Sequence, residues 1–218
     1  MISKIGKNIA IILARKNSKR IKNKNKVLLK NKKLIEHTFI VAKKSKLFTE
    51  ILLTTDDKEL IKLSKKYSIL APWVRPKKIS GDFSPSYNAV IHAYDWYEKN
   101  YEKVDGVFIL QPTSPFRTIK TLKEIIKIFK KSKKKSVINV SKCNEHPEWM
   151  LRLKNKKILP YISKKNFPTR SQSLTKLYKI NGLGYLINPS DLIKEKTLIP
   201  KNAIPCINKS KIESIDID

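Results

Sequence analysis

The sequence predicts an α/β fold in which a mostly parallel sheet is flanked by helices. Apolar runs typical of buried strands alternate about five times with amphipathic segments typical of helices, and this alternation indicates a parallel sheet. The first strand, over 8–13, is a continuous apolar run, as expected for a strand buried on both faces. With 218 residues, 40% of them hydrophobic, the chain can bury a core, and we expect a single domain over 1–218.

The N-terminal half supplies the first elements of this alternation. After the strand over 8–13 we expect a polar loop over 14–26, an amphipathic helix over 34–44, a strand over 50–54, a helix ending near residue 67 and a short strand over 69–73. The helix that ends near residue 67 begins at a capping-box pattern in which we assign the cap to Asp56.

The second half continues the alternation and then departs from it. We expect a helix from residue 86, a buried strand over 104–110, a helix capped by Thr118, a strand over 135–140 and a final strand over 184–187. Between 141 and about 180 the alternation stops, and lysine, proline and isolated aromatic residues follow one another. We interpret this segment as an excursion from the sheet, a β-arm used in dimerisation.

The formal net charge of +30 raises the hypothesis of nucleic-acid binding, because basic surfaces gain affinity for polyanions by releasing counterions. Only six of the 48 basic residues are arginine, however, and the lysines are spread over every predicted helix. Nucleic-acid interfaces more often combine arginine forks and aromatic side chains on one surface. We therefore favour a compositional origin of the charge, which can still attract small anionic substrates, over a specific nucleic-acid partner.

The remaining composition excludes several classes of protein. The longest aliphatic run, over 9–14, is too short to cross a bilayer or to form the apolar region of a signal peptide. Cys143 and Cys206 form no disulfide framework and have no metal-ligand spacing, and the three histidines are too dispersed for a metal site. We expect a cytoplasmic enzyme or binding protein with no membrane association.

Three polar loops follow predicted strands, at the edge where open parallel sheets bind ligands. They cover 14–26, 75–86 and 111–117. The first loop contains neither the G-x-x-x-x-G-K-[ST] sequence of P-loop proteins nor the G-x-G-x-x-G sequence of dinucleotide-binding folds. Its arginine, lysine, hydroxyl and backbone donors suit a triphosphate, although an isolated basic loop is more often only solvated.

Asp216 and Asp218 alternate along an extended segment, so their carboxylates are expected on one face. Two carboxylates on one face suit Mg²⁺, which completes its coordination with phosphates and water. On spacing alone, a polar strand edge or a frayed terminus is the simpler interpretation of this pair.

Taken together, these segments resemble the acylneuraminate cytidylyltransferases, also called CMP-sialic acid synthetases. Residues 13–25 look like the A-R-x-x-S-K-x-x-x-x-K-N loop of that family, 54–57 like S-T-D-D, 75–82 like R-P-x-x-L-x-x-D, 110–117 like L-Q-P-T-S-P-L-R, 181–185 like N-G-A-I-Y and 214–218 like the metal-binding S-I-D-I-D. The segments occur in family order and cover practically the whole chain. The L-Q-P-T-S-P motif and the ordered set are the specific parts of the resemblance.

The resemblance implies a Rossmann-like nucleotidyltransferase fold with a small dimerisation arm, and a homodimer. It implies an enzyme that transfers CMP from CTP to a nonulosonic, sialic-type sugar acid, giving CMP-sugar and pyrophosphate for cell-surface glycan synthesis. Mg²⁺ is the implied cofactor.

The resemblance also implies a role for individual residues. CTP would be held by Ala14, Arg15, Ser18, Lys19, Lys24 and Asn25, with Arg15 and Lys24 on the phosphates, and by Arg75 and Ser86 at the cytosine and ribose. The sugar acid would contact Gln111, Arg170, Lys179 and Asn181. Asp216 and Asp218 would bind Mg²⁺ and, with Arg15 and Lys24, form the catalytic set.

The chain departs from the family pattern at several positions. Asn17 and Lys22 stand where the family usually has glycine and proline, and Lys179 stands where many members have arginine, which replaces a bidentate fork by a point charge. The sequence ends at Asp218, where relatives continue. These departures keep a catalytically inactive paralogue, acting as a partner subunit, as a second hypothesis, and a basic nucleic-acid-binding protein is the third.

The sugar acid is open between neuraminic, legionaminic, pseudaminic and other nonulosonic acids. Kdo, an eight-carbon sugar acid, is disfavoured because the enzymes that activate it have different loop sequences.

Overall fold

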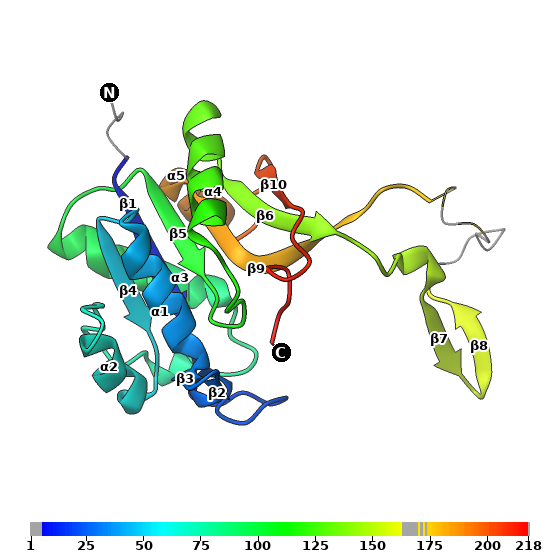
Figure 1. Ribbon diagram of the computed structural model, residues 1–218, viewed down its shortest axis with the longest axis horizontal. Helices are drawn as coiled ribbons and strands as arrows, with labels where there is room; N and C mark the ends of the chain where they lie inside the picture. The colour runs from blue at the N-terminus through cyan, green and yellow to red at the C-terminus, as the bar shows by residue number, and fades with distance from the viewer. Residues whose placement is uncertain (1–5, 163–169, 171, 173, 218) are drawn as a thin grey trace.

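The computed structural model describes residues 6–162, 170, 172 and 174–217, and it is built on a six-stranded sheet of order β10-β6-β9-β5-β1-β4 (Figure 1). The strands are β1 (Asn8–Leu13), β4 (Glu50–Thr54), β5 (Gly106–Leu110), β6 (Val137–Lys142), β9 (Tyr178–Ile187) and β10 (Ile204–Asn208). In this sheet β9 runs antiparallel to β5 and β6, whereas the other neighbours are parallel. The prediction of a mostly parallel α/β sheet is therefore confirmed.

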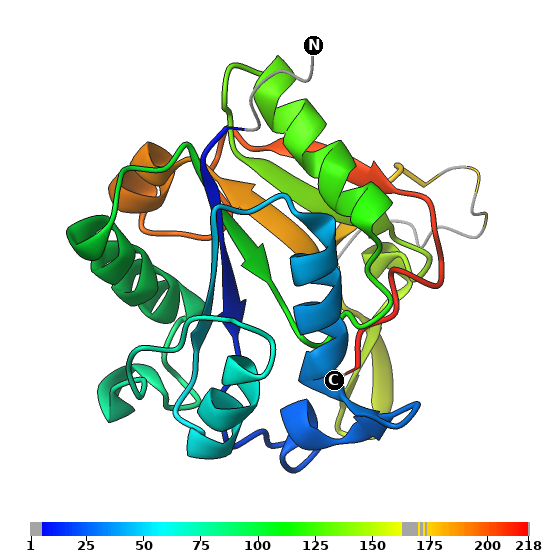
Figure 2. The same cartoon turned by 60° about the vertical axis from the view of Figure 1, so that its left-hand side comes forward.

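Helices cover both faces of the sheet (Figure 2). One apolar core lies between the sheet and α1 (Leu34–Ser45), α2 (Lys58–Lys65) and α4 (Ile119–Lys131). A second core lies between the sheet and α3 (Ser86–Asn100) and α5 (Pro189–Glu195). β1 contributes alternate side chains to both cores, which is why its sequence is continuously apolar.

Helix α4 shows how the sequence determines the packing of these layers. Its buried residues Leu122, Ile125, Ile126 and Phe129 recur at helical spacing and form one apolar stripe. The hydroxyl of Thr118 accepts a hydrogen bond from the backbone N–H of Thr121 and caps the first turn, as predicted.

The cap of α2 is Asp57, and the assignment of this cap to Asp56 was wrong. The Asp57 carboxylate accepts a hydrogen bond of 2.9 Å from the backbone N–H of Glu59. Asp56 accepts instead from the backbone N–H of Lys16, at 2.7 Å. A run of two aspartates can place either residue at the cap, and here the second one takes it because the first holds the neighbouring loop.

The predicted strand over 69–73 is reduced to a single bridge between Leu52 and Leu70. The N–H of Leu70 donates to Ile51, and the carbonyl of Leu70 accepts from Leu53. Pairing stops there because Pro72, two residues later, has no N–H to donate to the ladder.

The C-terminal part of the sheet is larger than predicted. β9 begins at Tyr178 rather than at residue 184, so the last strand of the prediction is only its second half. Neither α5 nor β10 was predicted. β10 contains Pro205, which is tolerated because β10 is an edge strand.

The segment between β6 and β9 leaves the body of the protein, and Figure 1 shows it extending well away from the sheet. It contains a 3₁₀ turn over Pro147–Trp149 and a hairpin of β7 (Leu151–Lys154) and β8 (Lys157–Pro160). Asn155 and Lys156 connect the two strands with positive φ angles of 50° and 62°, as two-residue hairpin turns require. The predicted excursion is therefore a β-arm, and we refer to residues 143–177 as the arm.

The smaller elements surround the first loop and the 75–86 loop. They are the 3₁₀ turns Lys24–Lys26 and Lys77–Ile79 and the two-stranded pair β2 (Leu28–Leu29) and β3 (Lys32–Lys33). Among the helices of the described residues, none is both long and apolar enough to cross a membrane.

Candidate nucleotide-binding site

A cavity of about 350 Å³ opens beyond the carboxyl ends of β1 and β5. Three segments that are distant in sequence line it, namely the first loop, the 75–86 loop and the start of the 111–117 loop. The lining includes eight of the residues singled out from the sequence: Arg15, Ser18, Lys19, Lys24, Asn25, Arg75, Ser86 and Gln111. This is the sheet edge at which parallel α/β folds bind their ligands.

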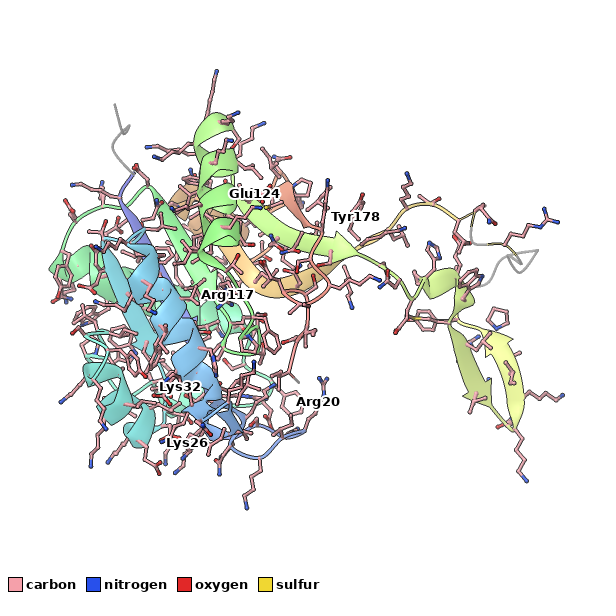
Figure 3. All side chains as sticks on the ribbon, viewed as in Figure 1. Arg20, Lys26, Lys32, Arg117, Glu124 and Tyr178 are labelled. Carbon is pink, nitrogen blue, oxygen red and sulfur yellow. The ribbon has the colours of Figure 1, made fainter. Side chains whose placement is uncertain are left out.

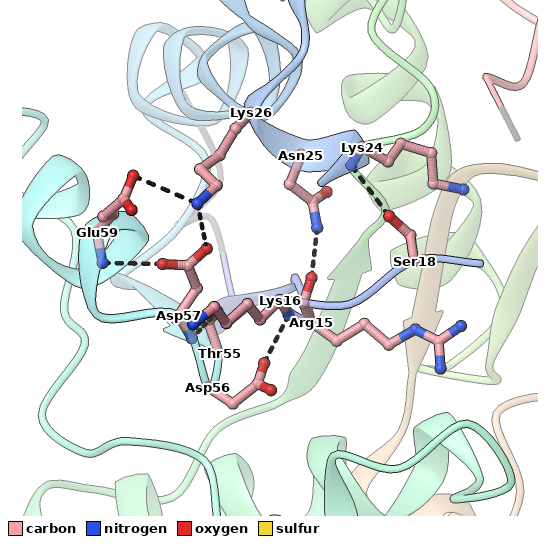
Figure 4. Close-up of polar contacts among 10 residues, drawn as sticks. All are labelled: Arg15, Lys16, Ser18, Lys24, Asn25, Lys26, Thr55, Asp56, Asp57 and Glu59. Atoms are coloured by element: carbon pink, nitrogen blue, oxygen red, sulfur yellow. Dashed lines mark hydrogen bonds and ion pairs between the residues drawn. The ribbon is translucent and has the colours of Figure 1, made fainter. Parts of the chain in front are cut away.

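The first loop is held in shape by its own polar side chains (Figure 4). The amide of Asn25 donates to the carbonyl of Arg15 at 3.1 Å, and the hydroxyl of Ser18 accepts from the backbone N–H of Lys24 at 3.0 Å. This hydrogen bond of Asn25 joins the two ends of the loop. Because Asn25 is buried, water cannot easily replace the bond if it is broken. Ser18 and Asn25 therefore fix the backbone that carries Arg15 and Lys24.

An ion-pair cluster attaches the same loop to the start of α2. The ammonium of Lys26 lies 3.1 Å from the carboxylate of Asp57 and 3.3 Å from that of Glu59. The hydrogen bond to Asp57 raises the pKa of Lys26, which stays charged. Figure 4 shows the side chains of Arg15 and Lys24 extending away from this cluster, on the other side of the loop.

Arg75 places a second guanidinium below the cavity. It is buried, and its side chain donates to the hydroxyl of Thr54 at 3.1 Å and to the carbonyl of the same residue. Burial lowers the pKa of Arg75 to about 10, the carboxylate of Asp56 acts in the opposite direction, and the charge of Arg15 lowers the pKa further. The guanidinium is still charged at neutral pH, so the floor of the cavity is positive.

Asp82 is the carboxylate that faces these cations. Its two oxygens lie 2.5 Å from a terminal guanidinium nitrogen of Arg15 and 3.1 Å from the ammonium of Lys19. A second cavity of about 260 Å³ adjoins here, and Arg15, Arg75 and Ser86 line both cavities. The 75–86 loop thus forms one wall of the site.

Gln111 lies at the far end of the cavity, in contact with Tyr185 of β9 and with Arg117. Its side-chain amide nitrogen is 3.5 Å from the hydroxyl of Tyr185, and its backbone carbonyl accepts a 2.7 Å hydrogen bond from the side chain of Arg117. A Cβ atom at Gly182 would come within 2.7 Å of the amide oxygen of Gln111 and 2.5 Å of the Ser114 hydroxyl. A side chain at position 182 would therefore force the Gln111 and Ser114 side chains to move from these positions.

Arg117 is buried beneath this end of the site (Figure 3). Besides Gln111, it donates to the carbonyls of Gly182, at 2.9 Å, and Leu183, and to the hydroxyl of Thr38 at 3.1 Å. Burial lowers its pKa to about 9. Arg117 and Tyr185 are not among the predicted site residues, although both lie inside the motifs that carry the resemblance.

The C-terminal segment returns to the same edge of the sheet. The carboxylate of Glu213 accepts hydrogen bonds from the hydroxyl of Thr118, at 2.8 Å, and the amide of Asn208, at 2.9 Å. The backbone N–H of Ile217 donates to the carbonyl of Thr113, a residue that lines the cavity, at 2.9 Å. These contacts place Asp216 beside the 111–117 loop, and its charge contributes, after burial, to raising the pKa of Tyr185 to about 12.

Asp216 has the chemistry expected of an Mg²⁺ ligand. Within the described part of the chain no three His, Cys, Asp or Glu side chains gather in a metal-binding cluster, so a site built from these side chains alone is absent there. Mg²⁺ commonly takes one or two carboxylates and completes its coordination with substrate phosphates and water. The exposed carboxylate of Asp216 fits that donor set, whereas Asp218 lies outside the described residues.

Four other predicted contact residues lie outside the first cavity. Ala14 is buried, and its N–H donates to the carbonyl of Thr54 at 3.1 Å. Asn181 is buried as well, with its amide nitrogen 2.6 Å from the Ser141 hydroxyl. Lys179 lines a separate cavity of about 720 Å³ together with Asp216. Arg170 is exposed and belongs to the arm.

The comparison with family models identifies the family. A family model described as cytidylyltransferase matches residues 9–195. The chain belongs to the cytidylyltransferase family. It is therefore an enzyme of the nucleotidyltransferase type, and the resemblance to the acylneuraminate cytidylyltransferases is confirmed.

Curated cytidylyltransferases resemble this one over almost its whole length. A CMP-N,N'-diacetyllegionaminic acid synthase of Legionella pneumophila is 32% identical over 96% of this chain and 90% of its own. A pseudaminic acid cytidylyltransferase of Campylobacter jejuni is 29% identical over 96% of this chain and 91% of its own. An N-acylneuraminate cytidylyltransferase of Escherichia coli is 28% identical over 97% of this chain, which spans 49% of that longer protein.

Solved structures share the fold of this cytidylyltransferase at much lower identity. A 4-diphosphocytidyl-2C-methyl-D-erythritol synthase superimposes with a TM-score of 0.68 at 12% identity, covering 97% of this chain and 92% of its own. A CMP:2-keto-3-deoxy-manno-octonic acid synthetase complexed with CTP has a TM-score of 0.63 at 16% identity, covering 87% and 77% respectively. These neighbours confirm the Rossmann-like nucleotidyltransferase fold.

Proposed function

We propose that this cytidylyltransferase transfers CMP from CTP to a nonulosonic, sialic-type sugar acid, releasing pyrophosphate, and that it works in the cytoplasm in cell-surface glycan synthesis. The observation that carries the proposal is the cavity at the carboxyl ends of β1 and β5. It joins a cationic loop at one end to the Gln111 amide at the other. The C-terminal segment with Asp216 is fastened beside it by the hydrogen bond from Ile217 to Thr113.

The cationic end suits a triphosphate. Arg15, Lys19 and Lys24 line it and present charge-assisted donors, and Arg75 adds a buried positive charge below them. Because Ser18 and Asn25 fix the loop backbone, the positions from which these side chains extend are set before the substrate arrives. Such preorganisation lowers the entropic and reorganisation cost of aligning the reacting phosphate.

The reaction assigns a separate task to each end. The anomeric hydroxyl oxygen of the sugar acid attacks the α-phosphorus and forms a new P–O bond, while the bond from that phosphorus to the bridging oxygen breaks. Pyrophosphate leaves with the electron pair of the broken bond, and the hydroxyl proton passes to solvent. Arg15 and Lys24 neutralise charge on the phosphates, while Gln111 holds the sugar in line.

Asp216 would hold Mg²⁺ together with the phosphates, and Asp218 is the second ligand that the resemblance implies. The ion would supply charge neutralisation on the α-phosphate and on the leaving pyrophosphate. The role of Asp216 is then to hold a divalent cation beside the 111–117 loop.

For the sugar, we propose an acid of the legionaminic and pseudaminic type, with neuraminic acid as the alternative. Similarity to the legionaminic acid synthase, at 32% identity, supports the first of these acids, whereas the pseudaminic acid enzyme and an N-acylneuraminate enzyme of Streptococcus agalactiae are both 29% identical. Lys179, beside Asp216 in the larger cavity, supplies a positive charge for the sugar carboxylate.

We also propose that the enzyme acts as a homodimer joined through the arm. The arm carries large apolar side chains in exposed positions, among them Trp149, Met150, Leu153, Ile158 and Tyr161. Exposed apolar surface of this kind commonly marks a protein interface. A second copy of the chain is the partner that the family resemblance implies.

Pyrophosphate release tests the reaction. The purified protein is incubated with CTP and Mg²⁺ and with N,N'-diacetyllegionaminic, pseudaminic, N-acetylneuraminic acid or Kdo in turn. We expect release with one of the first three acids and no release when Mg²⁺ is withheld. Release with Kdo alone would overturn the assignment of the sugar class.

Silence with all four acids, from folded protein that still binds CTP, would favour an inactive paralogue. Asp216→Ala tests the metal ligand in the same assay. We expect loss of Mg²⁺-dependent turnover with retained CTP binding, and an unchanged rate at saturating Mg²⁺ would remove Asp216 from the site.

A further inference from the structure

Asp82 has no task in the reaction described above, although it lies at the phosphate end of the site. One of its oxygens is 2.5 Å from the guanidinium of Arg15, and the other is 3.1 Å from the ammonium of Lys19. Its pKa is lowered, first by the hydrogen bond from Lys19 and also by the charge of Arg15, so the carboxylate is ionised at neutral pH. Two of the cations that line the triphosphate end thus already share one anion.

A carboxylate at this position is unfavourable for a bound triphosphate. Arg15 lines the cavity, so a phosphate that pairs with its guanidinium comes close to Asp82, and two like charges at such a distance repel each other. The phosphate and the carboxylate also require the same N–H donors of Arg15 and Lys19. The two anions are therefore competitors for one pair of cations.

We propose that Asp82 is an internal counter-anion that occupies Arg15 and Lys19 in the empty enzyme and that the phosphates of the nucleotide must displace. The inference rests on the proposed function only in taking the Arg15 and Lys19 end of the cavity as the place of the phosphates. Asp82 would then select among ligands. A ligand can pair with Arg15 and Lys19 only if its negative charge binds them more strongly than the Asp82 carboxylate does.

The geometry allows this displacement. The side chains of Arg15 and Asp82 are each 35% exposed, and that of Lys19 is 67% exposed, so water can solvate each partner when the pairs separate. Ion pairs with this exposure are individually weak and are screened by salt. A multiply charged pyrophosphate group, with more acceptor oxygens than one carboxylate, can therefore replace Asp82.

The same exchange operates at the end of the reaction. Once pyrophosphate has left, the CMP-sugar retains a single phosphate, with less charge to compete for Arg15 and Lys19. Asp82 can then pair with both cations again, which favours release of the product over its retention.

Calorimetric binding of CTP and of inorganic pyrophosphate, without any sugar acid, tests the inference. Asp82→Asn keeps the size of the side chain and removes its charge. We expect it to bind both ligands about three- to tenfold more tightly than the wild type at low salt, because no anion has to be displaced. The gain should shrink as the ionic strength is raised.

Asp105→Asn is the matched control. Its side chain is 31% exposed and pairs with Lys134 at 2.5 Å, so the substitution removes the same charge from a similar ion pair. Asp105 precedes β5 and lies at the amino end of the sheet, away from the cavity. We expect its affinities for CTP and pyrophosphate to equal those of the wild type.

Weaker or unchanged binding by Asp82→Asn would overturn the inference, because a carboxylate that only orients Arg15 would lower the affinity when it is lost. An equal gain in Asp105→Asn would overturn it too, since the effect would then come from net charge. Failure of both wild type and Asp82→Asn to bind either ligand would also reject it. If Asp82→Asn binds more tightly and Asp105→Asn does not, but the wild type turns over no sugar acid, the proposed function is contradicted and the inference about Asp82 stands.

Discussion

Arginine residues with very different surroundings serve the site at both ends. Arg15 is partly exposed and pairs with a carboxylate that a ligand can replace. Arg117 is buried and is bound by three backbone carbonyls and one hydroxyl, without a carboxylate within ion-pair distance among the described residues. The first arrangement suits a residue that exchanges partners, and the second suits one that must hold its neighbours fixed.

The role of Gln111 is predicted to be confined to the sugar acid. Gln111→Ala removes the amide that would hold the acceptor and leaves the cationic loop intact. We expect the KM for the sugar acid to rise about tenfold or more, consistent with loss of one or two hydrogen bonds, with little change in the dissociation constant of CTP. Steady-state kinetics and CTP calorimetry check both parts. Equal weakening of CTP binding would contradict the assignment.

The buried guanidinium of Arg117 is predicted to be important for stability. Arg117→Met removes the side-chain donor to the carbonyls of Gly182 and Leu183 in a water-poor position. It leaves the carbonyl of Gln111 with only the 3.3 Å hydrogen bond from the backbone N–H of Ser114. We expect the free energy of unfolding to fall by about 3 kcal/mol or more, measured by urea denaturation.

Lys123→Met is the control for this change. Lys123 lies on the exposed face of α4, outside the site and the arm, where loss of the charge leaves no buried group unpaired, so stability should change by less than about 0.5 kcal/mol. Equal effects of the two substitutions would show that the Arg117 network contributes nothing beyond a generic loss of charge.

Elements with strong local signals are predicted well from the sequence. β1 and β4 begin and end where predicted, because each is an apolar run that is buried on both faces of the sheet and ends at a polar loop. α4 was predicted from its apolar stripe and its Thr118 cap. In each of these elements the residues that decide the conformation lie within the element itself.

Elements decided by tertiary pairing were missed or misjudged. β10 is short, contains a proline and buries only Cys206 fully, so it is a strand only because β6 lies beside it. β9 enters between β5 and β6 in the antiparallel direction, which no local pattern in its sequence indicates. α5 did carry a signal, since Asn188 caps it and Pro189 is its first residue.

In the candidate site, too, the features with local sequence signals were predicted and those that depend on tertiary pairing were not. The motifs indicated which loop residues gather at the carboxyl ends of the strands, because loop residues after parallel strands share one edge. They did not indicate that Lys179 and Asn181 diverge, since that depends on how β9 is inserted. Asn181 lies within the sheet and bonds the Ser141 hydroxyl, while Lys179 faces the larger cavity.

The arm offers a prediction at the scale of an element. Leu153 and Ile158 are cross-strand partners in the β7–β8 hairpin, with exposed fractions of 80% and 64%. If the arm joins two copies of the chain, Leu153→Ser with Ile158→Ser removes apolar contact area from the interface. We expect light scattering to show a shift from dimer towards monomer at micromolar concentration.

The next cross-strand pair in the same hairpin provides the control. Lys154→Ser with Lys157→Ser changes two residues that face each other without removing apolar surface, so the dimer should persist. A wild-type monomer, or an unchanged mass in the apolar double variant, would remove the arm from the proposed interface.

At the scale of the whole molecule, the net charge of +30 helps to attract anionic ligands but does not determine which ligand binds. A strongly positive protein attracts CTP and sugar acids from solution and so raises their association rates at low salt. The contacts that select a ligand are much more local, within one cavity and a few ion pairs. The lysines on the solvent face of α4 and on the other helices contribute to the long-range attraction and not to the selection of a ligand.

This distinction predicts how the protein responds to nucleic acid. Duplex DNA should bind at about 50 mM salt, through phosphate contacts with scattered lysines, and should be lost by about 200 mM because each contact releases counterions. CTP binding should weaken far less over the same range, since it involves few charges and one of them, Arg75, is buried where salt screens it less. Fluorescence anisotropy with labelled DNA and calorimetry with CTP measure the two salt dependences. DNA affinity that survives 200 mM salt would require an organised nucleic-acid surface, and the charge would then have a specific partner.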